Sequence, residues 1–216
     1  MVTIAHIYND FNGKFGIPRQ PHLVQELHST IVFEPEYRNA DALRGLEGFS
    51  HLWIIWQFSE AVRQQWSPTV RPPRLGGNTR MGVFATRSPF RPNPIALSSV
   101  KLAGIEQTEA YGTVLKIRGA DLMDGTPIFD IKPYISMDCH PDAVCGFQEH
   151  TRNHQLKVLI DDALLSLVEP VYQDGLLACL SQDPRPSYQD DPLRVYGFPF
   201  AGFDVRFCVD GNELTV

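Results

Sequence analysis

The chain has 216 residues, of which 43% are hydrophobic and 20% charged, so it is neither a disordered chain nor a collagen-like or coiled-coil fibre. Its length fits one large domain, or one domain with a small appendage. The formal net charge of −6 gives no overall positive field, so a nucleic acid or an anionic membrane would have to meet a local basic patch.

Short β-strands separated by Gly, Pro and Asp dominate the sequence before residue 150. The pattern predicts strands at 2–8, 28–33, 51–58, 81–86, 95–105, 112–119, 127–131 and around Tyr134. One short helix, ended by Gly, is expected over residues 39–48. Because a compact mostly-β unit has to protect its sheet edges, we expect a mostly-β, barrel-like core over residues 1–150.

The pattern changes after residue 150. It predicts a strand at 155–160, helices at 161–168 and 175–182, and a strand at 203–209 that turns into a last strand. These elements indicate a small α+β C-terminal domain over residues 151–216.

Membrane insertion, secretion and metal binding are not expected. Apolar runs such as residues 52–56 are far shorter than the roughly 18 to 20 residues that cross a bilayer, and the N-terminus has no secretory pattern. The four cysteines are too few for a disulfide framework. Cys139, His140, Cys145 and His150 match none of the usual zinc-site spacings, so we expect incidental loop residues there. A cytoplasmic protein with reduced thiols is therefore predicted.

Residues 61–105 form a locally basic segment. They contain six arginines and one lysine but no Asp or Glu, so the segment carries +7 while the rest of the chain carries −13. Proline and glycine restrain the backbone here, and guanidinium groups pair bidentately with carboxylates and phosphates. The segment is a candidate surface for an anionic ligand. The alternative is a solvated loop whose arginines pair with the acidic remainder of the chain.

A second cluster, residues 121–134, places three carboxylates in a turn and a strand. Asp124-Gly125 is a tight-turn signal, so one interpretation is that these side chains stabilise a turn and have no other role. If the cluster faces the basic segment, it can instead bind ribose hydroxyls or an ammonium group, while the arginines hold the anionic part of the ligand. An amino acid joined to a nucleoside has this mixture of charges. We expect the two segments to form one pocket. Rossmann, P-loop, hydrolase-elbow and zinc-protease motifs are absent from the sequence.

Both segments resemble the TsaA-like family of S-adenosylmethionine-dependent tRNA methyltransferases. The resemblance rests on residues 81–94 (MGVFATRSPFRPNP) and 121–134 (DLMDGTPIFDIKPY), and extends to shorter blocks at 18–21, 49–53, 71–77 and 182–188. It implies a barrel-like methyltransferase core, a small C-terminal domain and a homodimer. The implied reaction is methylation, by S-adenosyl-L-methionine, of N6 in the threonylcarbamoyl-adenosine next to the anticodon of threonine tRNA.

The resemblance also implies a set of cofactor contacts. The matching positions are Gln20, Pro21, Phe58, Ser59, Arg87, Leu97, Asp124, Gly125, Thr126 and Pro127. Arg87 is expected to pair with a carboxylate of the cofactor or an acidic group of the modified base, and Phe58 and Leu97 to form an apolar wall. Asp124 is the candidate acceptor of the N6 proton, with turn stabilisation or cofactor binding as alternatives.

Candidate RNA contacts come from the basic side chains. Phosphate binding is predicted for Arg71, Arg74, Arg80 and Arg91, with Arg185 of the C-terminal domain as a further candidate, and for each the alternative is an ion pair within the protein. Two other functions stay open. One is a binding module that senses the cofactor without transferring its methyl group, and the other is methylation of another RNA or a small molecule.

Overall fold

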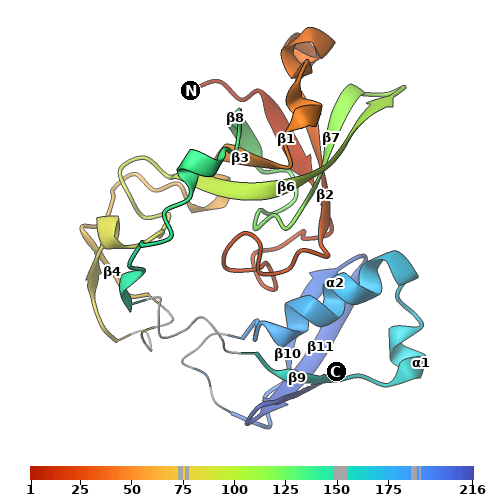
Figure 1. Cartoon of the computed structure of the whole chain (residues 1–216). Coiled ribbons are helices and arrows are strands. Elements are labelled where there is room, and N and C mark those ends of the chain that lie inside the picture. Colours follow the sequence, from red (N-terminus) through yellow and green to blue (C-terminus); the bar gives the residue numbers. More distant parts are fainter. Residues whose placement is uncertain (73–74, 76–77, 148–154, 186–188, 190) are drawn as a thin grey trace.

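A closed ring of six strands forms the N-terminal part of the molecule (Figure 1). The computed structural model describes residues 1–216 except 73–74, 76–77, 148–154, 186–188 and 190. The ring runs in the order β1 (Ala5–Tyr8), β2 (His28–Phe33), β7 (Gly112–Arg118), β6 (Ile95–Thr108), β3 (His51–Gln57) and β8 (Pro127–Pro133). It closes where Ala5 of β1 pairs with Ile128 of β8. The expectation of a mostly-β, barrel-like core is confirmed.

Alternation along β3 shows how the sequence fills this ring. Leu52, Ile54 and Trp56 point inward and are buried, while the side chains between them are partly open. Strands have a side-chain period of two, so one face of β3 joins the core and the other faces outward. The strand expected at 51–58 is therefore half-buried, with one face in the core and the other facing outward.

A smaller α+β unit follows the ring, as expected. Its four-stranded sheet has the order β10 (Tyr196–Phe200), β11 (Phe203–Asp210), β12 (Glu213–Thr215) and β9 (Lys157–Leu159), with β12 and β9 parallel. Helices α1 (Asp162–Leu165) and α2 (Pro170–Ser181) accompany the sheet. Leu176 and Leu180 of α2 share an apolar core with Phe198, Phe200 and Phe207. In the described part of the chain, no helix combines the length and apolarity that crossing a bilayer requires.

The loop after β1 joins the two units. Phe11, Val24 and Leu27 of this loop belong to the core of the C-terminal unit. Gly16 has φ +92°, and a Cβ added to it would lie 2.3 Å from Cδ2 of Phe198. Glycine is required here both by the left-handed backbone and by the close approach of the ring. This packing holds residues 14–20 next to the open end of the barrel.

Several elements differ from the sequence-based expectation. The strand expected at 81–86 is only β5 (Met81–Gly82), which pairs with β4 (Thr69–Val70) and is followed by a 3₁₀ turn, Val83–Ala85. The helix expected at 39–48 is two 3₁₀ turns, Ala40–Leu43 and Leu46–Gly48, because Gly45 between them has φ +88°. Other 3₁₀ turns are Pro35–Tyr37, Ser59–Ala61 and Ser136–Asp138. The strand expected around Tyr134 is absent because β8 ends at Pro133, and β10 was not expected at all.

Candidate functional site

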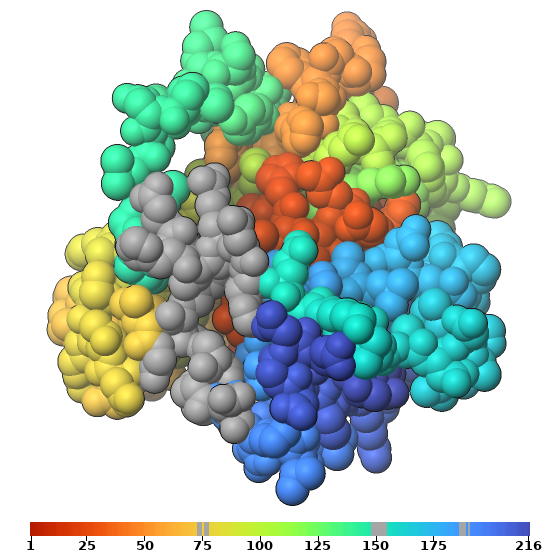
Figure 2. All heavy atoms as spheres, turned by 60° about the horizontal axis from the view of Figure 1, so that its bottom comes forward, coloured from red at the N-terminus to blue at the C-terminus, as the bar shows by residue number. Residues whose placement is uncertain are grey.

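A cavity of about 1050 Å³ opens between the basic lobe (residues 61–94), the N-terminal loop and the open end of the barrel. The basic segment contributes Arg63, Arg71, Arg80 and Arg87 to its lining, and the Asp-Gly segment contributes Asp121, Met123 and Thr126. Figure 2 shows the lobe (yellow) and the C-terminal unit (blue) on opposite sides of this face of the molecule. Ligand pockets usually measure about 300–1,000 Å³, so this one has room for a nucleoside cofactor and part of a second ligand. The prediction that both segments line one pocket is confirmed.

The described hydrogen bonds from the arginines of the lobe go to neutral groups, although Arg87 is near enough for its charge to act on the Asp121 carboxyl group. In the described ranges, none of Arg63, Arg71, Arg80, Arg87 and Arg91 has a carboxylate within ion-pair distance. Three of them donate hydrogen bonds to neutral groups: Arg87 to Gln20 Oε1 (2.7 Å), Arg80 to Thr69 Oγ1 (2.9 Å) and Arg91 to the carbonyl of Thr86 (3.2 Å). The guanidinium of Arg63 lies over the Phe90 ring, 3.6 Å from its centre. The lobe is therefore able to bind anions without first breaking internal ion pairs.

Half of the expected cofactor contacts line the cavity. These are Gln20, Phe58, Ser59, Arg87 and Thr126, whereas Pro21, Leu97, Asp124, Gly125 and Pro127 do not contribute to the lining. Pro21 adjoins Gln20, and Gly125 and Pro127 flank Thr126. Leu97 is half exposed on the outer face of β6, opposite the buried Ser98. Of the expected apolar wall, Phe58 lines the cavity and Leu97 does not, and Phe58 packs on Trp56, with ring centres 4.5 Å apart.

Asp124 anchors a turn outside the cavity lining. Its Oδ1 accepts a hydrogen bond from the backbone N–H of Asn9 (2.9 Å), and its own N–H donates to the carbonyl of Phe11 (2.9 Å). Gly125, with φ +72°, donates to the carbonyl of Ile7 (2.8 Å). These bonds fasten the turn to the N-terminal loop. The position of Asp124 matches the turn-stabilising alternative rather than proton transfer.

Asp121 is the carboxylate of the Asp-Gly segment that lines the cavity, where Glu60 is a second acidic residue, and the sequence did not single Asp121 out. Trp56 Nε1 donates to Ser98 Oγ (2.9 Å), and Ser98 Oγ donates to Asp121 Oδ1 (2.6 Å). Burial raises the pKa of Asp121 to about 6, although the Ser98 hydrogen bond and the Arg87 charge oppose the shift. A carboxylate with such a pKa is ionised at neutral pH yet more basic than an exposed one. Asp130, the third carboxylate of the cluster, pairs with Lys132 (2.9 Å).

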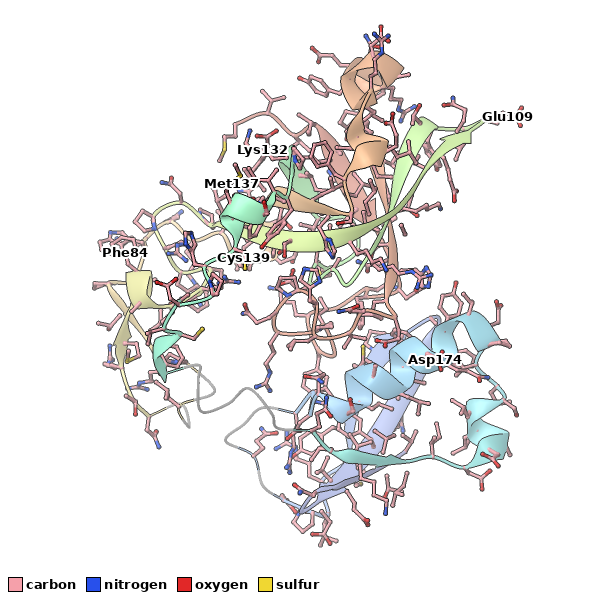
Figure 3. The ribbon with its side chains drawn as sticks, viewed as in Figure 1. Phe84, Glu109, Lys132, Met137, Cys139 and Asp174 are labelled. Carbon is pink, nitrogen blue, oxygen red and sulfur yellow. The ribbon has the colours of Figure 1, made fainter. Side chains whose placement is uncertain are left out.

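The cysteines and histidines do not assemble a metal site in the described residues. No group of three or more His, Cys, Asp or Glu side chains there is placed to hold a metal ion. All four cysteines are free, and Cys139, labelled in Figure 3, is exposed together with Cys145. His150 lies outside the described residues.

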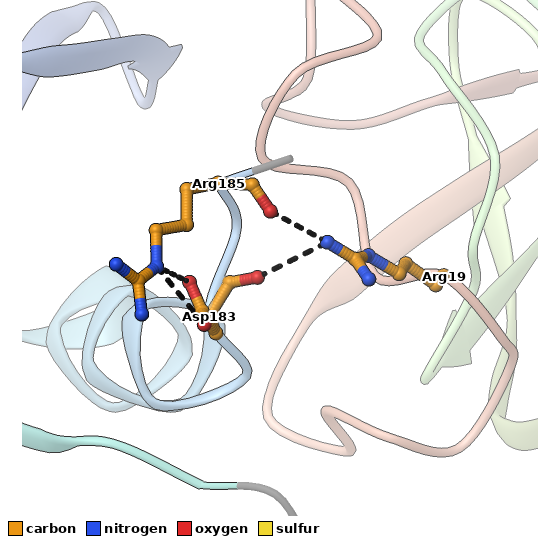
Figure 4. A network of polar contacts seen from close by, with 3 residues as sticks. All are labelled: Arg19, Asp183 and Arg185. Atoms are coloured by element: carbon orange, nitrogen blue, oxygen red, sulfur yellow. Dashed lines mark hydrogen bonds and ion pairs between the residues drawn. The ribbon is translucent and has the colours of Figure 1, made fainter. Parts of the chain in front are cut away.

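Arg185 does not face solvent as an RNA contact would. Its side chain is buried, and its Nε donates to both carboxylate oxygens of Asp183, at 3.0 and 3.2 Å (Figure 4). Arg19 Nη2 donates to the carbonyls of Asp183 (3.4 Å) and Arg185 (2.7 Å). The prediction for Arg185 is corrected: this arginine helps to tie the N-terminal loop to the C-terminal unit. Arg74 lies outside the described residues.

Comparison with known proteins assigns the family. The model of the tRNA-methyltransferase O N-terminal domain matches residues 6–139, and that of the TrmO C-terminal domain matches residues 142–216. A tRNA (adenine(37)-N6)-methyltransferase of Escherichia coli K12 is 41% identical over 222 residues, covering 99% of this chain and 94% of that protein.

Two further relatives extend the comparison. A Pyrococcus abyssi protein named "Probable S-adenosyl-L-methionine-binding protein" is 34% identical over 160 residues, covering 74% of this chain and 80% of that protein. The crystal structure of TrmO from Pseudomonas aeruginosa superimposes with a TM-score of 0.77 at 32% identity, covering 99% of this chain and 92% of that one. The resemblance noticed in the sequence is thus confirmed, and the chain belongs to the TrmO family.

Proposed function

We propose that this protein transfers a methyl group from S-adenosyl-L-methionine to N6 of the adenine at position 37 of a tRNA. Relatives over most of its length carry that activity in their names. The observation that carries the proposal is the shared cavity, in which arginines and the largely buried Asp121 line one space. Such a cavity suits a ligand that combines nucleoside, ammonium and carboxylate groups.

The cavity residues fit this cofactor. The Arg87 guanidinium, whose hydrogen bond in the described residues goes to the neutral Gln20 Oε1, is suited to the carboxylate of the methionine part. Trp56 and Phe58 offer aromatic surface for the adenine. When bound, the cofactor supplies a methyl group on a positively charged sulfur. A nitrogen in line with the C–S bond can attack the methyl carbon, and the sulfur is the leaving group.

Asp121 is proposed to accept the proton that N6 loses. With the cofactor bound as methyl donor, the Asp121 carboxylate would take the proton that N6 loses on methylation and would then release it to water. Ser98, itself held by Trp56, fixes Oδ1 and thereby the orientation of the carboxylate. Asp121 replaces Asp124 in this role because Asp121 lines the cavity and Asp124 does not.

The substrate is proposed to be threonylcarbamoyl-adenosine in threonine tRNA. The threonyl part of this base carries a carboxylate and the RNA strand carries phosphates, and Arg71 and Arg80 line the same cavity without a carboxylate partner in the described residues. The base lies in a single-stranded loop, where moving it out of the stack costs less than in a duplex.

The assembly and location of the protein are also proposed. We propose a homodimer, since Leu97 and Met137 expose large apolar surfaces. We propose the cytoplasm as its location, where tRNA is present and the four free cysteines stay reduced. We propose a division into two domains at residues 150 and 151; the two family matches also divide the chain, but about ten residues earlier, since one ends at 139 and the other starts at 142.

Methyl transfer to tRNA tests the proposal. Purified protein and methyl-labelled cofactor are incubated with total tRNA from cells that have or lack threonylcarbamoyl-adenosine, and the nucleosides are separated by mass spectrometry. Label is expected at N6 of threonylcarbamoyl-adenosine, and only in the first tRNA pool. Label in another nucleoside or a small molecule would replace the proposed substrate, and binding of the cofactor without consumption would identify a sensing module.

A further inference from the structure

Two large aromatic side chains stand exposed and stacked on the basic lobe. Trp66 is 48% and Phe84 is 72% exposed. Their ring centres are 6.0 Å apart with an angle of 23° between the ring planes. Figure 3 shows Phe84 at the outer edge of the lobe. Single exposed apolar residues are common on protein surfaces, but a stacked pair presents one continuous aromatic face.

The backbone beneath this pair is held in place on both sides. Ser67, next to Trp66, donates from its N–H to the carbonyl of Phe90 (3.0 Å). Val83, next to Phe84, is buried and donates to the carbonyl of Pro68 (3.0 Å). The β4–β5 ladder lies between these two anchors. The two rings therefore project from a braced support, and binding a ligand on them would need little further ordering of the chain.

The surroundings of the pair favour an anionic, base-containing partner. The lobe holds no Asp or Glu, and Arg63 and Arg80 extend from it without a carboxylate partner in the described ranges. Ser67, adjacent to Trp66, lines the cavity, so the support of the pair is continuous with the site. A symmetric contact between two copies of this lobe would bring positive charge against positive charge. An RNA strand supplies negative phosphates to the arginines and a flat base to the rings.

From these observations we infer that Trp66 and Phe84 form a stacking platform for a nucleobase of the anticodon loop that flanks the methylated adenine. The inference rests on the proposed function, because it takes tRNA as the substrate. Bases in single-stranded loops are recognised by stacking on aromatic side chains, and phosphates by arginine. The methylated base enters the cavity, while the flanking base stacks on the face of Phe84. The platform thus sets the register of the loop.

Truncation of each ring tests the platform. Phe84→Ala and Trp66→Ala are expected to weaken binding of a threonine-tRNA anticodon stem-loop by about 5- to 150-fold, since one base stacks on the pair. Cofactor affinity by calorimetry and the salt dependence of RNA binding should stay as in the wild type, because no phosphate contact is lost. Phe84→Tyr and Trp66→Phe should bind within about threefold of the wild type, because they keep an aromatic ring.

Tyr111→Ala is the matched control. The exposed fraction of Tyr111 is 49%, close to the exposed fraction of Trp66. Tyr111 lies in the turn between β6 and β7, near Glu109 at the far tip of the barrel (Figure 3). Its removal should leave stem-loop affinity unchanged. Stem-loops that lack the base at one flanking position complete the test. The wild-type protein should bind one of them more weakly than it binds the intact stem-loop. Phe84→Ala should bind both equally, because the stacking contact is already missing in this variant.

The outcomes separate this inference from the function on which it rests. Wild-type methyl transfer together with equal stem-loop affinity in all variants would overturn the platform and leave the proposed function intact. A wild-type protein that binds no stem-loop would overturn both. If Phe84→Ala instead dissociates a dimer in light-scattering measurements while RNA affinity is unchanged, the pair is a contact between copies and the platform is overturned.

Discussion

Replacement of Asp121 by Asn should make the protein more stable and less active. The pKa of Asp121 is raised from an ordinary value near 4 to about 6, so the native state binds this proton more tightly than the unfolded state. Stability therefore falls as pH rises from about 4 to 6, and the full cost of ionisation is present above that window. A shift of about two units corresponds to about 3 kcal/mol. Asn keeps an oxygen that can accept from Ser98 and is neutral at every pH.

Urea unfolding and transfer rates measure both effects. At pH 7.5, Asp121→Asn should raise the free energy of unfolding by up to about 3 kcal/mol, and the gain should vanish below about pH 4. Single-turnover methyl transfer should fall by about 100-fold or more, while cofactor affinity changes little. The wild-type rate should rise with pH, with a midpoint near the pKa of about 6.

Asp130→Asn provides the control for Asp121→Asn. Asp130 lies in the same segment but forms a largely exposed pair with Lys132, so this change should alter stability by less than about 1 kcal/mol and leave the pH profile in place. Our reasoning about Asp121 would be refuted if Asp121→Asn were less stable than the wild type at pH 7.5, or if its transfer rate matched that of Asp130→Asn.

Four other substitutions test three arginines of the cavity and the packing of the N-terminal loop. Arg87→Gln removes the charge expected at the cofactor carboxylate, and cofactor affinity by calorimetry should fall about tenfold or more; an unchanged affinity would contradict the role of Arg87. Arg71→Ala and Arg80→Ala should each lower the slope of log K against log salt for stem-loop binding by about 0.7, and an unaltered slope would show that neither contacts phosphate. Gly16→Ala should lower the melting temperature and reduce the free energy of unfolding by about 1–3 kcal/mol, because the added Cβ would clash with Phe198. A melting curve like that of the wild type would argue against the packing of the N-terminal loop on the C-terminal unit.

Asp121 and Asp124, two of the three carboxylates of the Asp-Gly segment, show what sequence reasoning missed. Asp124 precedes a glycine and was the more visible candidate, yet it anchors the turn to Asn9. Asp121 is held by a chain of hydrogen bonds through Ser98 and Trp56, which are distant from it in the sequence and adjacent to it in the barrel. A raised pKa depends on burial and on neighbours, and neither can be read from three residues of local sequence.

Local pattern predicted much of the architecture. A β-branched stretch predicted β2 and an apolar run predicted β3, and the charge asymmetry marked the basic lobe as a candidate anion-binding surface. Predictions failed where backbone geometry interrupts a pattern, as at Gly45, or where a contact between units decides the environment, as for Arg185.

The sequence by itself determined the family, the mostly-β character and the concentration of arginines in one acid-free segment, because these are properties of residue types and their order. Tertiary structure decided that this segment closes a cavity with Asp121, that the buried Arg185 is held through its carbonyl by Arg19 of the N-terminal loop, and that Trp66 stacks on Phe84. The reason is physical: charge and periodicity are carried along the chain, whereas burial, pKa and stacking arise only when residues far apart in sequence are packed together.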